Sequence, residues 1–187
     1  MVAVATDPPS AELVSRIRAG DRAAFEQVFR RWYAPLADYA SQILQNRDAA
    51  EDAVQDAFIA VWNRREALPE AAKLSAYLYR AVRNRALNQL RGQKGMASLD
   101  DDDSEEPSVE PAAVSALEHA DLAAAVAAAI GTLAPRTREV FLLSREQELT
   151  YTEIAETLGI SVKTVETLMG RALRTLRAML RPRTSDS

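Results

Sequence analysis

The chain has 187 residues, 48% of them hydrophobic, with a formal net charge of −4, no cysteine and a single histidine, His119. This length allows one ordinary domain or two small ones, and the lack of cysteine excludes disulfide scaffolds, thiolate nucleophiles and cysteine-ligated metal or iron–sulfur sites. A lone histidine excludes sites that need two imidazoles, and no apolar run approaches the roughly 18 residues that would span a bilayer. We therefore expect a soluble, cytoplasmic protein without membrane insertion.

The charge is distributed unevenly along the chain. Residues 1–94 carry 14 basic and 11 acidic side chains, residues 95–121 carry 9 acidic and no basic ones, and residues 122–187 carry 9 basic and 7 acidic ones. The net negative charge therefore comes from one central segment between two mildly basic blocks. A nucleic-acid partner is compatible with that distribution.

Long stretches without glycine or proline, with apolar residues three and four apart, predict helices in the N-terminal half. A short helix that begins at Ala11 should stop at Gly20, and Asp21 should cap the next helix, which meets a kink at Pro35. Asp48, followed by an acid three residues later, predicts the start of a third helix.

The third predicted helix has an apolar stripe and an opposite face of acidic and amide side chains. After a loop, a further helix should span 74–90, in a segment with basic side chains and no acidic one. Basic side chains interleaved with Tyr77 and Tyr79 suit a single nucleic-acid strand, whose bases stack on aromatic rings. Burial of these rings in a core is the alternative, and the helix by itself leaves both open.

Residues 95–113 combine acids, serine and proline with few large apolar residues, which predicts a flexible acidic linker. The acids at 100–106 lack the turn glycine and the final glutamate of a calcium loop, so we expect no metal and no cofactor. His119 has no partner cluster and is expected to be an ordinary helix-surface residue. An alanine-rich helix should resume near Val114 and break at Gly131.

From Tyr151 the sequence YTEIAETLGISVKTVETLMG fits a helix-turn-helix. Thr150 and Glu153 predict a capping box, Gly159 supplies the turn and Ser161 can cap the second helix. Apolar side chains recur at the positions that two crossed helices bury. The second helix exposes a polar face that comprises Lys163, Thr164, Glu166, Thr167, Arg171 and Arg174. Arginine can read guanine and glutamate can read cytosine, whereas Lys163 and Thr164 suit phosphates.

The order of three motifs is more specific than any one of them. The segments AEDAVQDAFIAVW and AYLYRAVRNRALNQLR, then the acidic segment, then LAPRTREVFLLSREQELTYTEIAETLGISVKTVE, together resemble bacterial sigma factors of the extracytoplasmic-function (ECF) type. The resemblance implies an all-α fold of two small helical domains, the second with the helix-turn-helix. Sigma domain two would span 11–94, the linker 95–113 and sigma domain four 114–182.

Residue roles are carried over from the family by motif. The resemblance implies that the polymerase clamp helices bind the face formed by Asp52, Gln55 and Asp56, with Trp62 at its edge. It implies that Asn84 lines the pocket for a base flipped from the downstream promoter element. The residues on or beside that face are Tyr77, Arg80 and Asn88. The loop 68–75 resembles the family's base-specificity loop, and the helix-turn-helix would read the upstream element.

The resemblance also implies the partners. These are core RNA polymerase, through its clamp helices and flap, promoter DNA as duplex and as melted strand, and an anti-sigma factor. The linker would thread the active-centre cleft of the polymerase. The C-terminal segment FLLSREQELTYTEIAETLGISVKTVE looks closest to the iron-uptake-regulator-like branch of the family. The protein would not be an enzyme by itself. Two alternatives are a helix-turn-helix regulator that binds duplex DNA without polymerase, and an enzyme that acts on nucleic acid through the linker carboxylates.

Overall fold

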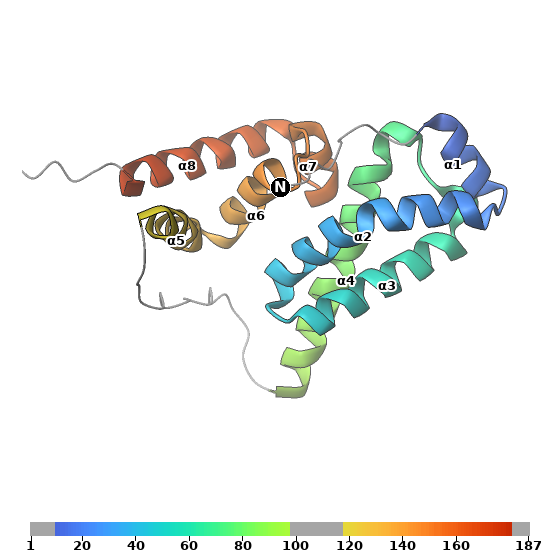
Figure 1. Cartoon of the computed structure of the whole chain (residues 1–187), viewed down its shortest axis with the longest axis horizontal. Coiled ribbons are helices and arrows are strands. Elements are labelled where there is room, and N and C mark those ends of the chain that lie inside the picture. Colours follow the sequence, from blue (N-terminus) through green and yellow to red (C-terminus); the bar gives the residue numbers. More distant parts are fainter. Residues whose placement is uncertain (1–9, 98–117, 181–187) are drawn as a thin grey trace, which may run out of the picture.

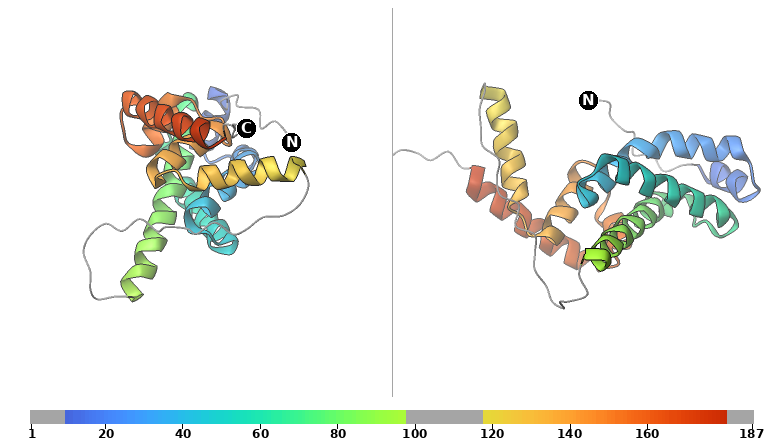
Figure 2. Two further views of the ribbon diagram at one scale, coloured as in Figure 1. Left: turned by 90° about the vertical axis from the view of Figure 1, so that its left-hand side faces the viewer. Right: turned by 90° about the horizontal axis from the view of Figure 1, so that it is seen from below.

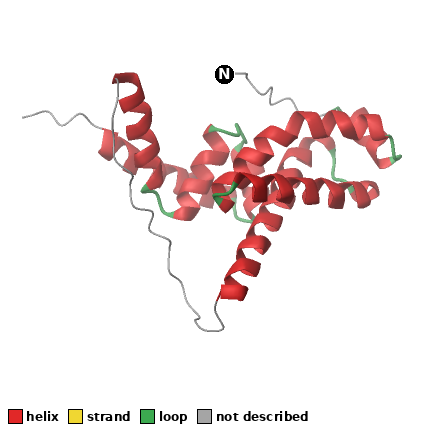
Figure 3. Cartoon of the chain, turned by 60° about the horizontal axis from the view of Figure 1, so that its bottom comes forward, coloured by secondary structure: helices red, strands yellow, loops and turns green. Residues whose placement is uncertain are grey.

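The computed structural model describes residues 10–97 and 118–180, which are helical and contain no strand (Figures 1 and 3). The α-helices, in chain order, are α1 (Ala11–Arg18), α2 (Arg22–Leu44), α3 (Arg47–Asn63), α4 (Leu74–Ala97), α5 (Glu118–Gly131), α6 (Pro135–Arg145), α7 (Tyr151–Leu158) and α8 (Val162–Leu180). Two 3₁₀ turns, η1 (Arg65–Ala67) and η2 (Ala71–Lys73), connect α3 to α4. The all-α prediction is confirmed for this part of the chain.

Side-chain caps set the starts of helices in the first module, α1–α4. The Asp21 carboxylate accepts a hydrogen bond from the Ala24 amide at 3.1 Å, as predicted. The third helix begins one residue before the predicted start at Asp48, because the Asn46 side chain accepts from the Ala49 amide at 3.0 Å and is the cap. Both caps satisfy amides that a helix leaves without a partner at its first turn.

Two helices continue past positions where the sequence predicts a kink, at Pro35, or an end, at Leu90. Helix α2 continues through Pro35 to Leu44, because the buried face around that proline packs on α3 and α4 and outweighs the lost backbone hydrogen bond. Helix α4 passes Leu90 and ends at Ala97, three residues inside the predicted linker. The left panel of Figure 2 shows its C-terminal end projecting beyond the other helices. The rest of that predicted linker, and the expected helix start at Val114, lie outside the described residues.

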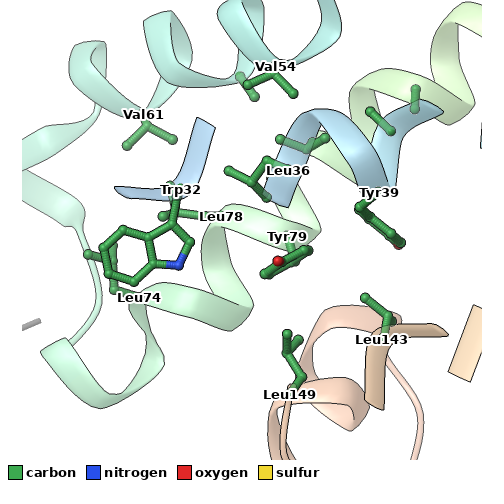
Figure 4. Packing of buried hydrophobic residues seen from close by; sticks show 14 of the residues in the cluster. Trp32, Leu36, Tyr39, Val54, Val61, Leu74, Leu78, Tyr79, Leu143 and Leu149 are labelled. Atoms are coloured by element: carbon green, nitrogen blue, oxygen red, sulfur yellow. The ribbon is translucent and has the colours of Figure 1, made fainter. Parts of the chain in front are cut away.

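The core of the first module lies between α2, α3 and α4. Leu36, Val54 and Leu78, one from each helix, are at most 2% exposed and point toward one another (Figure 4). Phe58 extends this core, with its ring centroid 4.9 Å from that of Phe29 and 5.8 Å from that of Phe25. Burial of such side chains is the main driving force for a bundle of this size.

The second module, α5–α8, contains the predicted helix-turn-helix in α7 and α8. The Thr150 hydroxyl accepts from the Glu153 amide and the Glu153 carboxylate accepts from the Thr150 amide, which confirms the capping box. Gly159 has φ +66°, the left-handed conformation that ends α7 at no steric cost. Ile154 and Val165 are fully buried between the two helices, as their spacing predicts.

Helix α5 is held in place by the side chain of Arg138. This guanidinium donates hydrogen bonds to the carbonyl oxygens of Ile130, Gly131 and Leu133, at the C-terminal end of α5. A cation at a helix C-terminus satisfies free carbonyls and opposes the negative end of the helix dipole. Apolar side chains of α5, of the turn that follows it and of α8 form a small second cluster, comprising Ala129, Leu133, Ala172 and Leu176.

The two modules pack against each other, with α7 lying along α4 (Figure 1). Tyr39 and Tyr79 of the first module lie beside Leu143 and Leu149 of the second, and all four are buried (Figure 4). One continuous hydrophobic cluster therefore includes residues of both modules. The sequence predicted two small domains but gave no sign of this contact.

Candidate functional site

The face of α3 predicted to bind the polymerase is exposed and rich in hydrogen-bond acceptors. Asp52 and Gln55 are exposed, and their side chains make no hydrogen bond or ion pair with any residue in the described ranges. Asp56, also exposed, has one carboxylate oxygen 3.8 Å from a nitrogen of Arg85 on α4. We define Asp52, Gln55 and Asp56 as the acceptor stripe. Its one-turn spacing presents these groups together to a partner's arginine or lysine side chains.

An apolar groove continues the acceptor stripe. Trp62 is half-buried, with its ring centroid 5.0 Å from that of Phe25 and 4.9 Å from the guanidinium carbon of Arg65. A groove of about 640 Å³ lies between α2 and α3, lined by Arg22, Phe25, Glu26, Phe29, Gln55, Phe58, Ile59 and Trp62. Sequence reasoning missed Ile59, whose side chain is 59% exposed. Its position four residues after Gln55, an apolar residue on a polar face, was the available signal.

The face of α4 predicted to contact the melted strand is also accessible. Arg80, Asn84 and Asn88, spaced four residues apart, are exposed along one side of the helix, and Tyr77 is half-buried. Tyr79 belongs to the core: it is 2% exposed and its hydroxyl donates to Gln147 at 2.7 Å. Burial raises the pKa of the Tyr79 hydroxyl above its ordinary value, so it remains a donor. The core alternative was therefore correct for Tyr79.

The predicted specificity loop, 68–75, is fixed to the body of the first module. Its first residue, Leu68, is buried, and its carbonyl accepts a hydrogen bond from the Arg18 guanidinium of α1 at 2.6 Å. The loop contains η2 and leads directly into α4. The short first helix thus holds one end of this loop in place.

The predicted DNA-reading face of α8 is exposed at all six of its residues, Lys163, Thr164, Glu166, Thr167, Arg171 and Arg174. The Ser161 hydroxyl caps the helix by accepting from the Thr164 amide at 3.1 Å, as predicted. The Thr164 hydroxyl is 2.8 Å from that of Ser161, and the Thr167 hydroxyl donates to the Lys163 carbonyl at 2.9 Å. Both threonines therefore stiffen the first turns.

Gly170 does not interrupt α8, although glycine costs about 1 kcal/mol relative to alanine inside a helix. A Cβ at this position would meet only a terminal nitrogen of Arg174, at 3.9 Å. The glycine is therefore not required by close packing within the chain. Arg171 and Arg174, which both follow Gly170, are exposed on this continuous helix.

The part of the chain that the structure describes shows no metal-binding cluster. Residues 10–97 and 118–180 contain no group of three or more histidine, cysteine or acidic residues placed to hold a metal ion. Among these residues, no helix is long and apolar enough to cross a membrane. The acids at 100–106 lie outside the described residues.

Comparisons with known proteins agree with the two modules. Residues 28–95 match the family model for Sigma-70 region 2, and residues 123–176 match that for Sigma-70, region 4. These two regions define the chain as an RNA polymerase sigma factor. The ECF sigma factor SigM of Mycobacterium tuberculosis is 31% identical over 173 residues, which cover 91% of this chain and 84% of SigM. The sigma factor CnrH of Cupriavidus metallidurans is 29% identical over 180 residues, which cover 90% of this chain and 92% of CnrH.

Solved structures give the same result. CnrH in complex with the cytosolic domain of CnrY matches with a TM-score of 0.66 and 27% identity, over 91% of this chain and 96% of that chain. RpoE of Bartonella quintana, in complex with the anti-sigma factor NepR, shares the fold with a TM-score of 0.63 and 23% identity, over 85% of this chain and 98% of that chain. The chain belongs to the ECF sigma factor family. It binds core RNA polymerase and directs promoter recognition at the initiation of transcription.

Proposed function

We propose that three helices each carry one functional surface: α3 binds core polymerase, α4 binds the melted strand and α8 binds the upstream promoter element. The acceptor stripe on α3, with Trp62 at its edge, binds the clamp helices of core polymerase. The observation that carries this assignment is that Asp52 and Gln55 are exposed without a partner among the described residues, so their acceptors are available to another protein. The adjoining apolar groove would add buried area to the same contact.

The face of α4 stabilises the melted strand. Asn84 presents an amide that can donate to and accept from a base edge, and Arg80 and Asn88 extend its polar face by one turn on each side. Tyr77 supplies a half-buried ring beside this face. Flipping a base costs a few kcal/mol, and contacts of the flipped base with these side chains offset that cost.

The face of α8 reads the upstream promoter element as duplex. Lys163 and Thr164, at its first turn, contact phosphates, whereas Glu166, Arg171 and Arg174 lie further along and contact base edges. The Thr167 methyl group is available for apolar contact with a base, since its hydroxyl already donates to the backbone.

The remaining proposals concern partners and context. We propose that an anti-sigma factor controls this protein, since the related CnrH forms a complex with the cytosolic domain of CnrY, and RpoE forms one with the anti-sigma factor NepR. The protein acts in the cytoplasm, where core polymerase is found, and has no catalytic activity of its own. Membership of the iron-uptake-regulator-like branch, the domain limits 11–94 and 114–182, and the path of the linker remain predictions.

Run-off transcription with core polymerase on genomic DNA fragments tests the proposal. We expect transcripts only when both the chain and core polymerase are present, and we expect the two to comigrate in size-exclusion chromatography. Specific duplex binding by the chain alone, without comigration, would instead identify a regulator that acts without polymerase. The transcript starts would also identify the promoters.

A further inference from the structure

Helix α8 contains a glycine that the chain itself does not require. Gly170 lies inside the helix, where glycine is less favourable than any other residue except proline. It lacks the positive φ that makes glycine suitable at Gly20 and Gly159. A Cβ at Gly170 would meet only a terminal nitrogen of Arg174, at 3.9 Å, which is ordinary van der Waals contact. Neither backbone conformation nor packing within the described residues therefore explains this glycine.

Gly170 lies within the DNA-reading face of α8. Helical periodicity places it one turn after Glu166 and Thr167 and one turn before Arg174. The opposite side of the helix is buried, where α8 packs against α5, α6 and α7 at one edge of the molecule (Figure 1). The buried residues of that side are Val165, Met169, Ala172 and Leu176. The glycine thus leaves a gap in the row of exposed side chains.

The surface exposed in this gap is apolar. The Gly170 amide lies inside the helix, where it donates to the backbone one turn earlier, so the residue presents its Cα hydrogens to a partner. The Thr167 hydroxyl donates to the Lys163 carbonyl at 2.9 Å, which leaves the methyl group of that side chain for outside contacts. We define the space over the Gly170 Cα, beside the Thr167 methyl group, as the glycine gap.

This surface determines which part of a DNA duplex fits the glycine gap. The gap itself supplies no hydrogen-bond donor, and the neighbouring Glu166 carboxylate repels a phosphate, so the sugar-phosphate backbone does not suit it. The polar groups on base edges have partners in the flanking charged side chains of Glu166, Arg171 and Arg174. The apolar group that base pairs present in the major groove is the C5 methyl group of thymine.

We propose that Gly170 is a specificity-determining residue, and that the glycine gap receives the C5 methyl group of one thymine in the upstream promoter element. This inference rests on the proposed function, because it assumes that α8 reads that element as duplex. Contact of the methyl group with Gly170 and Thr167 favours thymine over a base that lacks it. A side chain at position 170 would occupy the same space and keep the helix away from that base pair. The glycine therefore lowers helix stability in favour of binding.

Removal of single methyl groups from the DNA tests this fit. Deoxyuridine has the hydrogen-bonding groups of thymidine and lacks only the C5 methyl group, so its substitution probes that group alone. The probe is a promoter duplex identified by run-off transcription of genomic fragments, with each thymine of the upstream element replaced in turn by uracil on either strand. Fluorescence anisotropy measures the affinity of holoenzyme, formed from the full chain and core polymerase, for each duplex.

We expect holoenzyme with the unchanged chain to lose about fourfold in affinity at one thymine, as for one buried carbon. Uracil at thymines outside the upstream element should have no effect. Gly170→Ala should weaken binding to the unmodified promoter at least about fivefold, comparable to one mismatched base pair. This variant should prefer the duplex with uracil at the same position, because removal of the DNA methyl group makes room for the one added to the protein. The preference for thymine is thus reversed.

Stability provides an independent measurement with the opposite sign. Gly170→Ala should raise the midpoint of thermal unfolding by about 2–4 °C, because alanine favours the helix and its Cβ meets no atom closer than 3.9 Å. A more stable variant that binds its promoter less tightly is not a folding defect. Gly131→Ala, at the C-terminal end of α5, is the matched control: it adds the same methyl group where nothing lies within 4 Å, and its affinity should not change.

Two further variants separate the volume of the gap from helix propensity. Gly170→Ser fills the gap but favours the helix less than alanine does, so it should lose a similar factor in affinity with a smaller gain in stability. Thr167→Ser retains the hydroxyl that donates to Lys163 and removes the methyl group beside the gap. It should bind the unmodified promoter less tightly and reduce the effect of uracil at the same position.

Three results would overturn the proposal. Equal affinities for thymine and uracil at every position of the upstream element would mean that no methyl group is read. Equal losses by Gly170→Ala on the two duplexes would assign the glycine to flexibility of α8 instead. Undiminished binding of the unmodified promoter by Gly170→Ala would show that the gap stays empty in the complex. Failure of the unchanged chain to direct transcription with core polymerase would refute the proposed function, and with it this assignment.

Discussion

The carboxylates at the contact between the modules and on the acceptor stripe differ in whether their oxygens already accept hydrogen bonds from other side chains of the chain. Glu139 is nearly buried and accepts from Tyr39, Arg83 and Arg136. Asp52, on α3, is exposed and accepts from none of the described residues. A buried carboxylate needs its partners within the chain, whereas an exposed one can exchange water for a partner protein at low cost. Burial therefore separates groups that hold this chain together from groups available for binding.

The side-chain amides of the chain likewise divide into those that bond within the chain and those that are exposed. Gln147 accepts from the buried Tyr79 hydroxyl and so belongs to the contact between modules. Asn84, which carries the same kind of amide group, is exposed on α4. Burial of Tyr39, and then the nearby Glu139 carboxylate, raises the pKa of that tyrosine above its ordinary value and keeps its hydroxyl a donor. The contact should therefore not depend on pH near neutrality through either tyrosine.

The largest effect should come from removing the acceptor stripe. Replacing Asp52, Gln55 and Asp56 together with alanine should weaken the affinity for core polymerase at least about a hundredfold, because each loses charge-assisted contacts with the partner. Helix content should not change, since these side chains are exposed. Fluorescence anisotropy with labelled protein measures the affinity. Asp48→Ala, an exposed acid on the same helix, is the control, and undiminished binding by the triple variant would remove the stripe from the interface.

A smaller effect is expected for the exposed amide on α4. Asn84→Ala holoenzyme should assemble and bind duplex promoter, yet form fewer heparin-resistant open complexes, because only contacts specific to the open state shift the opening equilibrium. Loss of one such contact costs about 1–3 kcal/mol, or roughly a five- to hundredfold loss in opening.

Permanganate footprinting on duplex and on premelted promoters measures this loss. The premelted template should recover part of it, since the bases are already unpaired. Normal thymine reactivity on duplex DNA would show that Asn84 does not contact the melted strand.

The third prediction compares buried and exposed ion pairs directly. A double-mutant cycle on Arg83 and Glu139 should give a coupling of about 1–2 kcal/mol in the free energy of unfolding, because the pair is nearly buried. The same cycle on Arg30 and Glu26, whose side chains are 75% and 58% exposed, should give a coupling close to the error of measurement. Urea denaturation followed by circular dichroism provides both values. Equal couplings would mean that burial does not distinguish the two pairs.

The smallest effects should occur on α8. Lys163→Ala should weaken binding to all duplexes and reduce the slope of log affinity against log salt by about one, as expected for one phosphate contact. Glu166→Ala should instead change the base preference in a promoter library at similar overall affinity. Both residues are exposed, so neither change should alter stability. An unchanged library profile for Glu166→Ala would exclude it as a base reader.

The sequence by itself determined the features that depend on residues three or four positions apart. The Asp21 cap, the capping box of Thr150 and Glu153 and the turn at Gly159 are local, so pattern was enough to predict them. Exposure of the three polar faces was also predictable, because one turn of helix fixes which side chains share a face. The order of the motifs gave the family.

Only the tertiary structure decided which tyrosine of α4 is buried and where the modules meet. Tyr77 and Tyr79 lie on the same helix with similar neighbours in sequence, and the contact with the second module places Tyr79 inside. The partners of Glu139 lie 100 and 56 residues away, at Tyr39 and Arg83. Helical periodicity specifies a face but not the element that covers it, because the covering element depends on how separate helices pack in space.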